Sequence, residues 1–311
     1  MHPLPRYSSP ILGAILLVFF GAIAYSSKAI FVKLAYRYGV DSVSLVALRM
    51  AFSLPFFLAV ASYSRWQKQA ADTFRPKRRH WLELIVLGLL GYYVASLCDF
   101  MSLQYLSASL GRLILFIYPT LVLLLTAVFL KRKVSRVEAA AVIISYIGII
   151  LAFSQSVEIR QVPDFWMGVL FSFTSALTFA LYLIGSGEYL PRMGTLRYNS
   201  LTMSIACAAI LLHHGIQYRW ALFHFPMPVY GYALGMALVA TVLPSFMVAE
   251  GIRRLGAGTA AIISSVGPIS TILLASLILG ETFGGWQWLG AVLVIGGVLL
   301  LSWWKQRRSM P

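Results

Sequence analysis

Ten long apolar segments, separated by short polar stretches, constrain what this chain of 311 residues can fold into. Each is close in length to the ~20 residues that an α-helix needs to cross a bilayer. Backbone N–H and C=O groups have no partner in lipid, so segments of this length must be helical. The sequence therefore predicts an all-α integral membrane protein with ten transmembrane helices, at residues 11–36, 43–62, 82–106, 108–130, 137–154, 165–187, 200–216, 229–251, 256–279 and 285–304.

Composition supports a membrane protein and argues against nucleic-acid binding. Hydrophobic residues make up 59% of the chain and charged residues only 11%, whereas a soluble domain carries about 25% charged residues. The formal net charge is +15, but the basic residues form short clusters between apolar segments, as in loops that flank a bilayer. Cys98 and Cys207 lie inside apolar segments. We expect no nucleic-acid partner, no disulfide, no metal and no cofactor.

The positions of Lys and Arg predict the orientation of the chain. If the N-terminus is cytoplasmic, 18 of the 25 Lys and Arg residues fall in cytoplasmic stretches and three fall outside, at Arg37, Arg160 and Arg219. Basic residues accumulate on the cytoplasmic side of membrane proteins. We therefore expect a multi-pass inner-membrane protein with an even number of spans and with both termini in the cytoplasm.

An internal repeat relates the two halves of the sequence. An offset of 149 residues aligns residues 106–151 with 255–300 without a gap. The alignment pairs residues that membrane helices use sparingly, Pro119 with Pro268 and Gly148 with Gly297. A proline within a helix removes one backbone hydrogen bond and bends the helix. The two matched prolines are therefore also candidate hinges of a gate.

Each repeat contains five helices, an odd number, so the second copy must be inverted in the membrane. We expect one repeat in residues 1–155 and the other in 156–311. The loop after the fourth helix is Lys131-Arg132-Lys133, whereas its equivalent after the ninth is Gly280-Glu281-Thr282. Basic residues inside and an acidic residue outside fit two opposed copies. Inverted repeats of this kind are typical of alternating-access transporters, which hold their substrate between the repeats.

Several motifs resemble one family of transporters. Residues 249–300 contain Arg254-Leu255-Gly256-Ala257, Pro268, Gly280-Glu281 and the glycines of the last helix, and residues 88–109 match in the first repeat. On these motifs the chain resembles the drug/metabolite transporter superfamily, of the ten-helix EamA type. The resemblance implies a cavity lined by helices 1, 3, 4, 6, 8 and 9, and export of metabolites or amino acids. Lys131-Arg132 departs from the Gly-Glu pair that the family often has.

Five ionisable residues lie inside predicted helices of the first repeat: Lys28, Lys33, Arg49, Asp99 and Arg112. A charge near the bilayer centre costs ~2.5–3.5 kcal/mol on insertion scales, so such residues should face the interior of the bundle. Asp99 can neutralise one cation, which leaves at least two unmatched. A carboxylate or phosphate on the substrate would complete the balance, and arginine binds such groups through two parallel hydrogen bonds.

Structural roles for some of these charges stay open. Lys33 and Arg49 lie near enough to the outer interface to extend their charged ends into it. Arg112 and Asp99 could form an ion pair that locks two neighbouring helices. Lys28 lies deepest and follows Ser26 and Ser27, and it is the strongest candidate for substrate binding, followed by Arg112 and Asp99.

Four tyrosines are further candidates for the substrate site, although ordinary packing would also explain them. Tyr92 and Tyr93 follow Gly91 in the third predicted helix, and Tyr92 lies two helical turns from Asp99. Aromatic rings there would stack on an organic solute or close a gate. The other two candidates are Tyr118 and Tyr182.

These features predict a secondary transporter for a small organic solute, an amino acid or an organic anion, and a monomer is compatible with this function. An enzyme is not expected, because the five histidines lie at helix ends or in loops and no pair of intramembrane acids is present. A flippase for lipid headgroups would use the same basic residues and remains an alternative. The sequence leaves open the substrate, the direction of transport, the coupling ion and the oligomeric state.

Overall fold

All elements in the described part of the chain are helical. The structure, a computed structural model, describes residues 9–66, 78–129, 135–154, 164–219, 222–255, 260, 263–264 and 266–309. The first half contains α1 Ser9–Ser26, α2 Lys28–Tyr36, α3 Ser42–Trp66, α4 Arg78–Gly88, the π-helical segment η1 Leu89–Val94, α5 Ala95–Tyr105, α6 Ala108–Leu115, α7 Tyr118–Phe129 and α8 Arg136–Ser154. The second half contains α10 Phe165–Met193, α11 Thr195–Tyr218, α12 Met227–Ala237, η2 Leu238–Val242, α13 Leu243–Leu255, α15 Val266–Leu274, η3 Ala275–Leu279 and α16 Gly285–Ser309.

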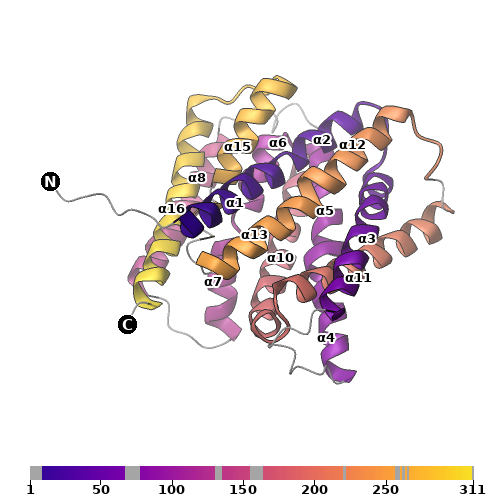
Figure 1. Cartoon of the computed structure of the whole chain (residues 1–311). Coiled ribbons are helices and arrows are strands. Elements are labelled where there is room, and N and C mark those ends of the chain that lie inside the picture. Colours follow the sequence, from indigo (N-terminus) through magenta and orange to yellow (C-terminus); the bar gives the residue numbers. More distant parts are fainter. Residues whose placement is uncertain are drawn as a thin grey trace.

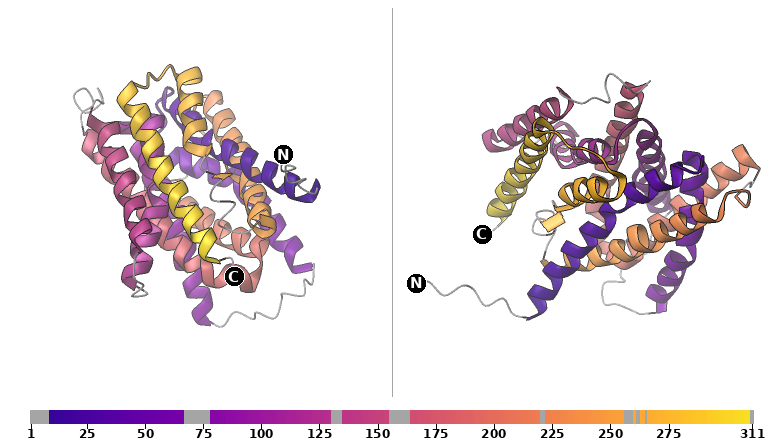
Figure 2. Two further views of the ribbon diagram at one scale, coloured as in Figure 1. Left: turned by 90° about the vertical axis from the view of Figure 1, so that its left-hand side faces the viewer. Right: turned by 90° about the horizontal axis from the view of Figure 1, so that it is seen from above.

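These helices form a bundle in which α1 and α2 run beside α13 and α12 (Figures 1 and 2). Within the described residues, seven helices are long and apolar enough to cross a membrane, and two more apolar helices are shorter, at Val266–Leu279 and Gly285–Leu300. The class predicted from the sequence, an all-helical membrane protein, is confirmed. The seven long helices are Leu12–Tyr36, Ser42–Ser64, Arg78–Tyr105, Ala108–Phe129, Phe165–Gly187, Thr195–Tyr218 and Met227–Gly251.

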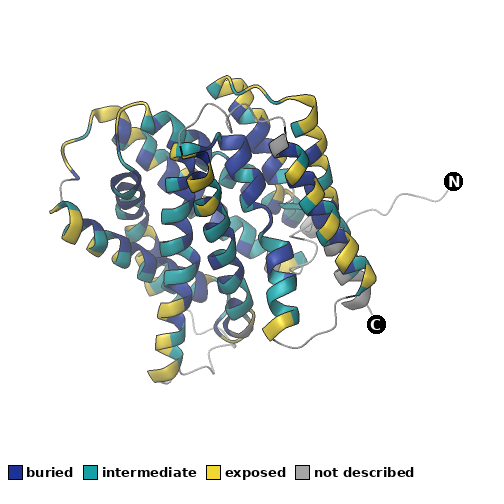
Figure 3. Ribbon diagram, turned by 180° about the vertical axis from the view of Figure 1, so that it is seen from behind, coloured by how far each residue is buried: buried dark blue, intermediate teal, exposed yellow. Residues whose placement is uncertain are grey.

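Exposed residues are concentrated on the outer faces of the helices, and buried residues face the interior (Figure 3). Many of the exposed residues are large and apolar, and many of the buried ones are small. Helix α8 illustrates the pattern. Its exposed face carries Ile143, Ile147 and Ile150, while Ala141 and Ala152 are fully buried. Lipid is as apolar as these isoleucines, so helices in a membrane associate through close packing of small residues rather than through burial of large ones.

Glycines bring α8 and α16 into backbone contact. A Cβ atom added to Gly148 would lie 2.6 Å from the Gly290 carbonyl oxygen, and one added to Gly297 would lie 2.6 Å from the Ala141 carbonyl oxygen. No side chain fits at either position without separating the helices. The two contacts exchange under the 149-residue offset, because this offset relates Gly148 to Gly297 and Ala141 to Gly290.

Two of the three π-helical segments in the described residues, η1 and η2, follow the same offset. They begin at Leu89 and Leu238, which are 149 residues apart. A π-helical turn inserts an extra residue into a helix and frequently occurs at functional sites. In each half, the segment divides one long helix into two parts: α4 and α5 flank η1, and α12 and α13 flank η2.

Two neighbouring glycines of α16 provide a test of the α8–α16 contact. We predict that Gly297→Ala lowers the thermal stability of the purified protein, because its methyl group would lie 2.3 Å from Ser145 Oγ and overpacking costs about 1–3 kcal/mol. Gly296→Ala is the matched control: nothing lies within 4 Å of its added Cβ, and alanine is the better helix former. Equal melting temperatures for the two variants would contradict the contact.

Candidate functional site

Two serines interrupt the first long helix just before Lys28. Ser27 Oγ donates to the Ala24 carbonyl oxygen at 2.7 Å. Ser26 Oγ lies 2.7 Å from a carbonyl of its own preceding turn and 2.8 Å from the Gly267 carbonyl oxygen of the neighbouring helix. Hydroxyls that bond back to the preceding turn compete with the helix and bend it. Accordingly α1 ends at Ser26, and Lys28 begins α2.

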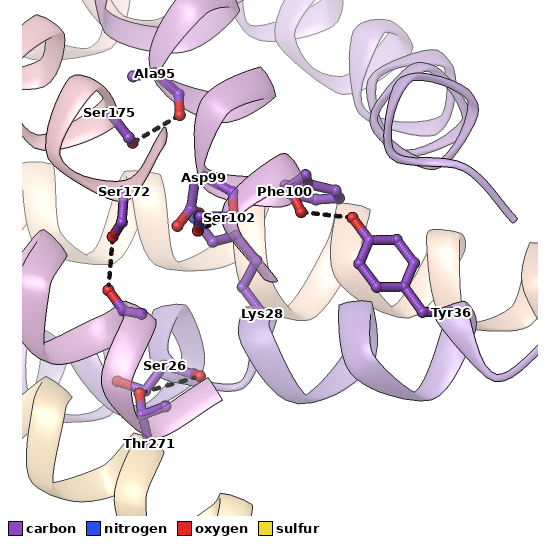
Figure 4. A network of polar contacts seen from close by, with 11 residues as sticks. Ser26, Lys28, Tyr36, Ala95, Asp99, Phe100, Ser102, Ser172, Ser175 and Thr271 are labelled. Carbon is purple, nitrogen blue, oxygen red and sulfur yellow. Dashed lines mark hydrogen bonds and ion pairs between the residues drawn. The ribbon is translucent and has the colours of Figure 1, made fainter. Parts of the chain in front are cut away.

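Lys28 forms an ion pair with Asp99 of α5 (Figure 4). The side chains are 16% and 8% exposed, respectively. A charge this deep in a membrane helix requires a partner of opposite sign. The sequence predicted that Asp99 neutralises one cation, and that cation is Lys28. Among the described residues, Asp99 makes no ion pair with Arg112, so the alternative of an Asp99–Arg112 lock is not what the structure contains.

Arg49 of α3 is buried rather than extended toward the outer interface. Its residue is 3% exposed, and its guanidinium lies over the Phe100 ring, 4.8 Å from the ring centroid. Arg49 Nε and Nη2 have no hydrogen-bond partner within the described part of the chain. The interpretation that this arginine extends to the interface is therefore wrong. Arg49 packs against α5, which carries Phe100. A cation over an aromatic face gains ~2 kcal/mol when desolvated.

Arg112 of α6 lies beside Gly267 of α15. Its Nη2 atom lies 3.8 Å from the position that a Cβ on Gly267 would occupy, so the guanidinium uses the space that this glycine leaves on α15. Arg49 and Arg112 are both close enough to Lys28 to interact with it electrostatically, and Asp99 interacts with all three. We call Lys28, Arg49, Asp99 and Arg112 the charged cluster. With three cations and one carboxylate, its formal charge is positive by two.

Four aromatic residues lie together, and we call them the aromatic cluster: Tyr92, Tyr118, Phe179 and Tyr182. Tyr118 is close enough to Arg112 of the charged cluster to interact with it electrostatically. Tyr182 Oη donates to Tyr92 Oη at 3.3 Å, and Tyr92 Oη donates to Asn199 Oδ1 at 3.4 Å. The Tyr92 and Tyr182 rings meet edge to face with centroids 5.0 Å apart, and Tyr118 and Phe179 do so at 5.1 Å. The structure thus brings together three of the four predicted tyrosines.

Tyr93 is directed elsewhere. Its hydroxyl lies 3.0 Å from His213 Nδ1 of α11, whereas Tyr92 contacts Tyr182 of α10 and Asn199 near the other end of α11. Gly91, which precedes the two tyrosines, allows Tyr182 to approach the backbone: an added Cβ would lie 2.3 Å from Tyr182 Cγ. Tyr93 stays a candidate from the sequence, but it packs with α11 rather than with the aromatic cluster.

One of the two candidate hinge prolines lies in the first turn of a helix. Pro119 is the second residue of α7, and the helix breaks just before it, at Phe116–Ile117. In a first turn the missing N–H has no partner to lose, so Pro119 begins a helix instead of bending one. Pro268 is the third residue of α15 as described. A role of either proline as a hinge stays a prediction.

Glu281 connects the end of η3 to the beginning of α6. Gly280 has φ +71°, a left-handed conformation that glycine adopts freely and that ends the helix. The turn carries the Glu281 carboxylate to α6, where it accepts hydrogen bonds from Ala108 N at 2.7 Å, Ser109 N at 3.1 Å and Ser109 Oγ at 2.7 Å. A carboxylate at a helix N-terminus satisfies free N–H groups and complements the helix dipole. The Gly-Glu motif thus acts as an interhelical cap.

Sequence analysis missed several residues of the site. Tyr25 interacts electrostatically with both Arg49 and Arg112. Tyr25 precedes Lys28 by three residues, so both lie on one side of a helix. This spacing could have predicted that Tyr25 lies near the charges. Phe100 and Asn199 gave no such signal, because only the packing of α5 against α3 and of α11 against η1 brings them to the charges and the tyrosines.

Comparison with known proteins defines the class and the family. Charges in the interior of a multi-helix membrane protein are typical of transporters. Several proteins similar to this chain are described as transporters. The chain is 31% identical over 295 residues to the uncharacterized transporter YcbK of Bacillus subtilis, covering 93% of this chain and 91% of that protein. It is 23% identical to the uncharacterized inner membrane transporter YicL of Salmonella typhimurium, covering 87% and 88%.

The sequence model of the EamA-like transporter family matches residues 12–154 and residues 166–303. The chain belongs to this family, as the resemblance implied. A crystal structure of another protein, 16% identical in sequence, has a TM-score of 0.65 and covers 95% of this chain and 98% of that one. At this identity the likeness supports the fold alone.

The charged cluster predicts an order of effects on stability. Asp99→Asn leaves three cations without a carboxylate, whereas Lys28→Met leaves Asp99 with two arginines nearby. Removal of one partner from a buried pair costs about 3–5 kcal/mol, so we expect Asp99→Asn to lower the melting temperature in detergent more than Lys28→Met. Arg79→Gln, in an exposed ion pair, is the control and should change little. A larger loss for Lys28→Met would contradict the assignment.

Proposed function

We propose that the protein is a secondary transporter that moves a small organic metabolite, an organic anion or an amino acid, across the inner membrane. The observation that supports this most is the charged cluster, which is positive by two and lies beside the aromatic cluster. Unmatched buried cations are expensive. A solute carboxylate that reached them would remove part of that cost. The family resemblance further supports export.

We propose ten membrane crossings in two inverted repeats, residues 1–155 and 156–311, with both termini in the cytoplasm. Three observations support this arrangement. The family matches the chain in two segments, residues 12–154 and 166–303. The segments η1 and η2 begin at the repeat offset, and the glycine contacts between α8 and α16 exchange under it. One pattern in two orientations gives two conformations of similar energy, as alternating access requires.

Contacts between two groups of helices provide a gate. Helices α2, α12, α13 and α15 pack with α1 or with each other, while α5, α6 and α7 pack on α10. The groups pack directly where α15 meets α6 and where α2 meets α5. Polar interactions between described residues also connect them: the Lys28–Asp99 ion pair, the hydrogen bond of 2.6 Å from Tyr36 Oη to the Phe100 carbonyl oxygen, and the Glu281 cap on α6. In the proposed orientation, Tyr36 and Glu281 lie toward the outside. These contacts close the outer side, and the outward-open conformation breaks them.

Substrate binding then competes with the ion pair. An anionic group of the solute in the charged cluster would compete with Asp99 for the cations around it and weaken the Lys28–Asp99 ion pair, which is a contact between the two groups of helices. The solute thereby has different affinities for the closed and open arrangements, which is what shifts a conformational equilibrium. The aromatic cluster, held by Gly91 and Asn199, would contact the organic part of the solute.

Neutral variants of the charged cluster test the proposed function. We expect Lys28→Ala and Arg112→Ala to abolish transport of organic anions and amino acids in proteoliposomes, because each removes a binding charge. Expression in the membrane should persist, and Arg79→Ala, at the exposed start of α4, should transport like wild type. Wild-type rates in both cluster variants would defeat the site. Movement of labelled lipid without uptake of any soluble solute would support a flippase instead.

The Glu281 cap predicts a shift toward the outward-open conformation when its charge is removed. Glu281→Gln should increase, by up to about tenfold, the rate at which an impermeant maleimide added outside modifies Tyr25→Cys in a Cys98→Ser, Cys207→Ser background. Glu250→Gln, the same change in α13 where Glu250 pairs with Arg254, is the control. A slower or unchanged reaction in Glu281→Gln would show that the cap does not close this side.

A further inference from the structure

The charged cluster contains one carboxylate for three cations, and the two cations without a carboxylate partner are Arg49 and Arg112. Asp99 is already engaged by Lys28. It is also the carboxylate whose field reaches both Arg49 and Arg112. Neither arginine forms an ion pair with a carboxylate in the described part of the chain. Two guanidinium charges therefore remain, that of the buried Arg49 and that of the half-buried Arg112. Arginine stays protonated in proteins, so loss of a proton does not relieve the imbalance.

Arg49 lacks hydrogen-bond acceptors as well as a carboxylate partner for its charge. It is 97% removed from solvent, and its Nε and Nη2 atoms lack partners among the residues that the structure describes. The Phe100 ring contacts the face of the guanidinium but accepts no hydrogen bond from its edge. A buried donor without an acceptor costs about 1–3 kcal/mol, more when it is charged. The free edge of Arg49 matches a carboxylate or a phosphate.

Arg49 and Arg112 come from different helices and share one neighbour, Tyr25, with which each interacts electrostatically. Arg49 lies in α3 against α5, whereas Arg112 lies in α6 beside Gly267 of α15. The two charges therefore stand at separate positions around Tyr25 and Lys28. One anionic group on each would cancel the charge that Asp99 leaves.

We propose that the transported solute is a dianion, a dicarboxylate or a phosphate monoester, held between Arg49 and Arg112. This inference rests on the proposed function and specifies its substrate class. A monoanion would leave the charged cluster positive by one. A zwitterionic amino acid would leave it positive by two and would place its ammonium group among three cations. A dianion brings the cluster to neutrality.

Matched pairs of ligands that differ by one charge test the proposal. Binding to the purified full-length protein would be measured by calorimetry for malonate, succinate, glutarate and adipate, for the half-amide of each, and for methyl phosphate. The half-amides keep the shape and lose one charge. We expect at least one dicarboxylate or methyl phosphate to bind about tenfold more tightly than its singly charged analogue (for methyl phosphate, dimethyl phosphate).

Variants assign the preference to the two arginines. Arg112→Gln and Arg49→Lys should each reduce the preference for the dianion to about twofold or less, because the first removes a charge and the second removes the planar edge. Arg79→Gln, at an exposed position, should keep it. If Arg49→Lys fails to fold, Arg112→Gln alone decides. A preference limited to dicarboxylates identifies that class, and one limited to methyl phosphate identifies a phosphate ester.

Two results would overturn the inference. One is equal affinity for dianions and their singly charged analogues, and the other is an absence of binding by every dianion tested. If proteoliposomes nevertheless transport a monoanion or an amino acid, the proposed function stands and only the substrate class is wrong. If no solute is transported and only labelled lipid moves, the proposed function itself fails.

Discussion

The buried Lys28–Asp99 ion pair is the interaction on which the rest of the site depends. It joins α2 to α5, and these helices belong to different groups in the bundle. Two serines lie just before Lys28, where α1 ends and α2 begins. With Asp99 committed to Lys28, the two arginines nearby keep their charge unmatched. The segment Ser26–Lys28 thus contains both the helix interruption and the lysine that pairs with Asp99.

Close approach between helices explains why those charges stay where they are. Gly91 admits the Tyr182 ring, Gly267 leaves space used by Arg112, and the glycines of α8 and α16 bring two backbones together. A membrane offers no hydrophobic drive for helix association, so such contacts and interhelical hydrogen bonds hold the bundle. The Glu281 cap adds a charged hydrogen bond at one end. Because this cap and the ion pair both connect the two groups of helices, loosening them is compatible with an otherwise rigid bundle.

The class of fold was accessible from the sequence, since lipid permits few structures. Charges stand out in apolar helices, and they pointed to the residues of the candidate site. Asp99 was correctly expected to pair with a cation, and Tyr92, Tyr118 and Tyr182 do lie near one another. Arg49 was placed wrongly at the interface, because helical position gives depth but not the neighbouring helix that covers a side chain. Asn199 and the capping role of Glu281 required tertiary packing. The repeat offset stays a prediction that the positions of η1 and η2 support.

The electrostatic potential at Tyr25 tests the central claim most directly, since this residue interacts with both unmatched arginines. Tyr25→Cys, in a chain without its two native cysteines, would be modified by methanethiosulfonate reagents of similar size and opposite charge. Their rates would be divided by those for a free thiol in solution. A positive interior predicts that the anionic reagent reacts faster on this scale and that a bound anion reduces its advantage. A faster reaction with the cationic reagent would contradict the account.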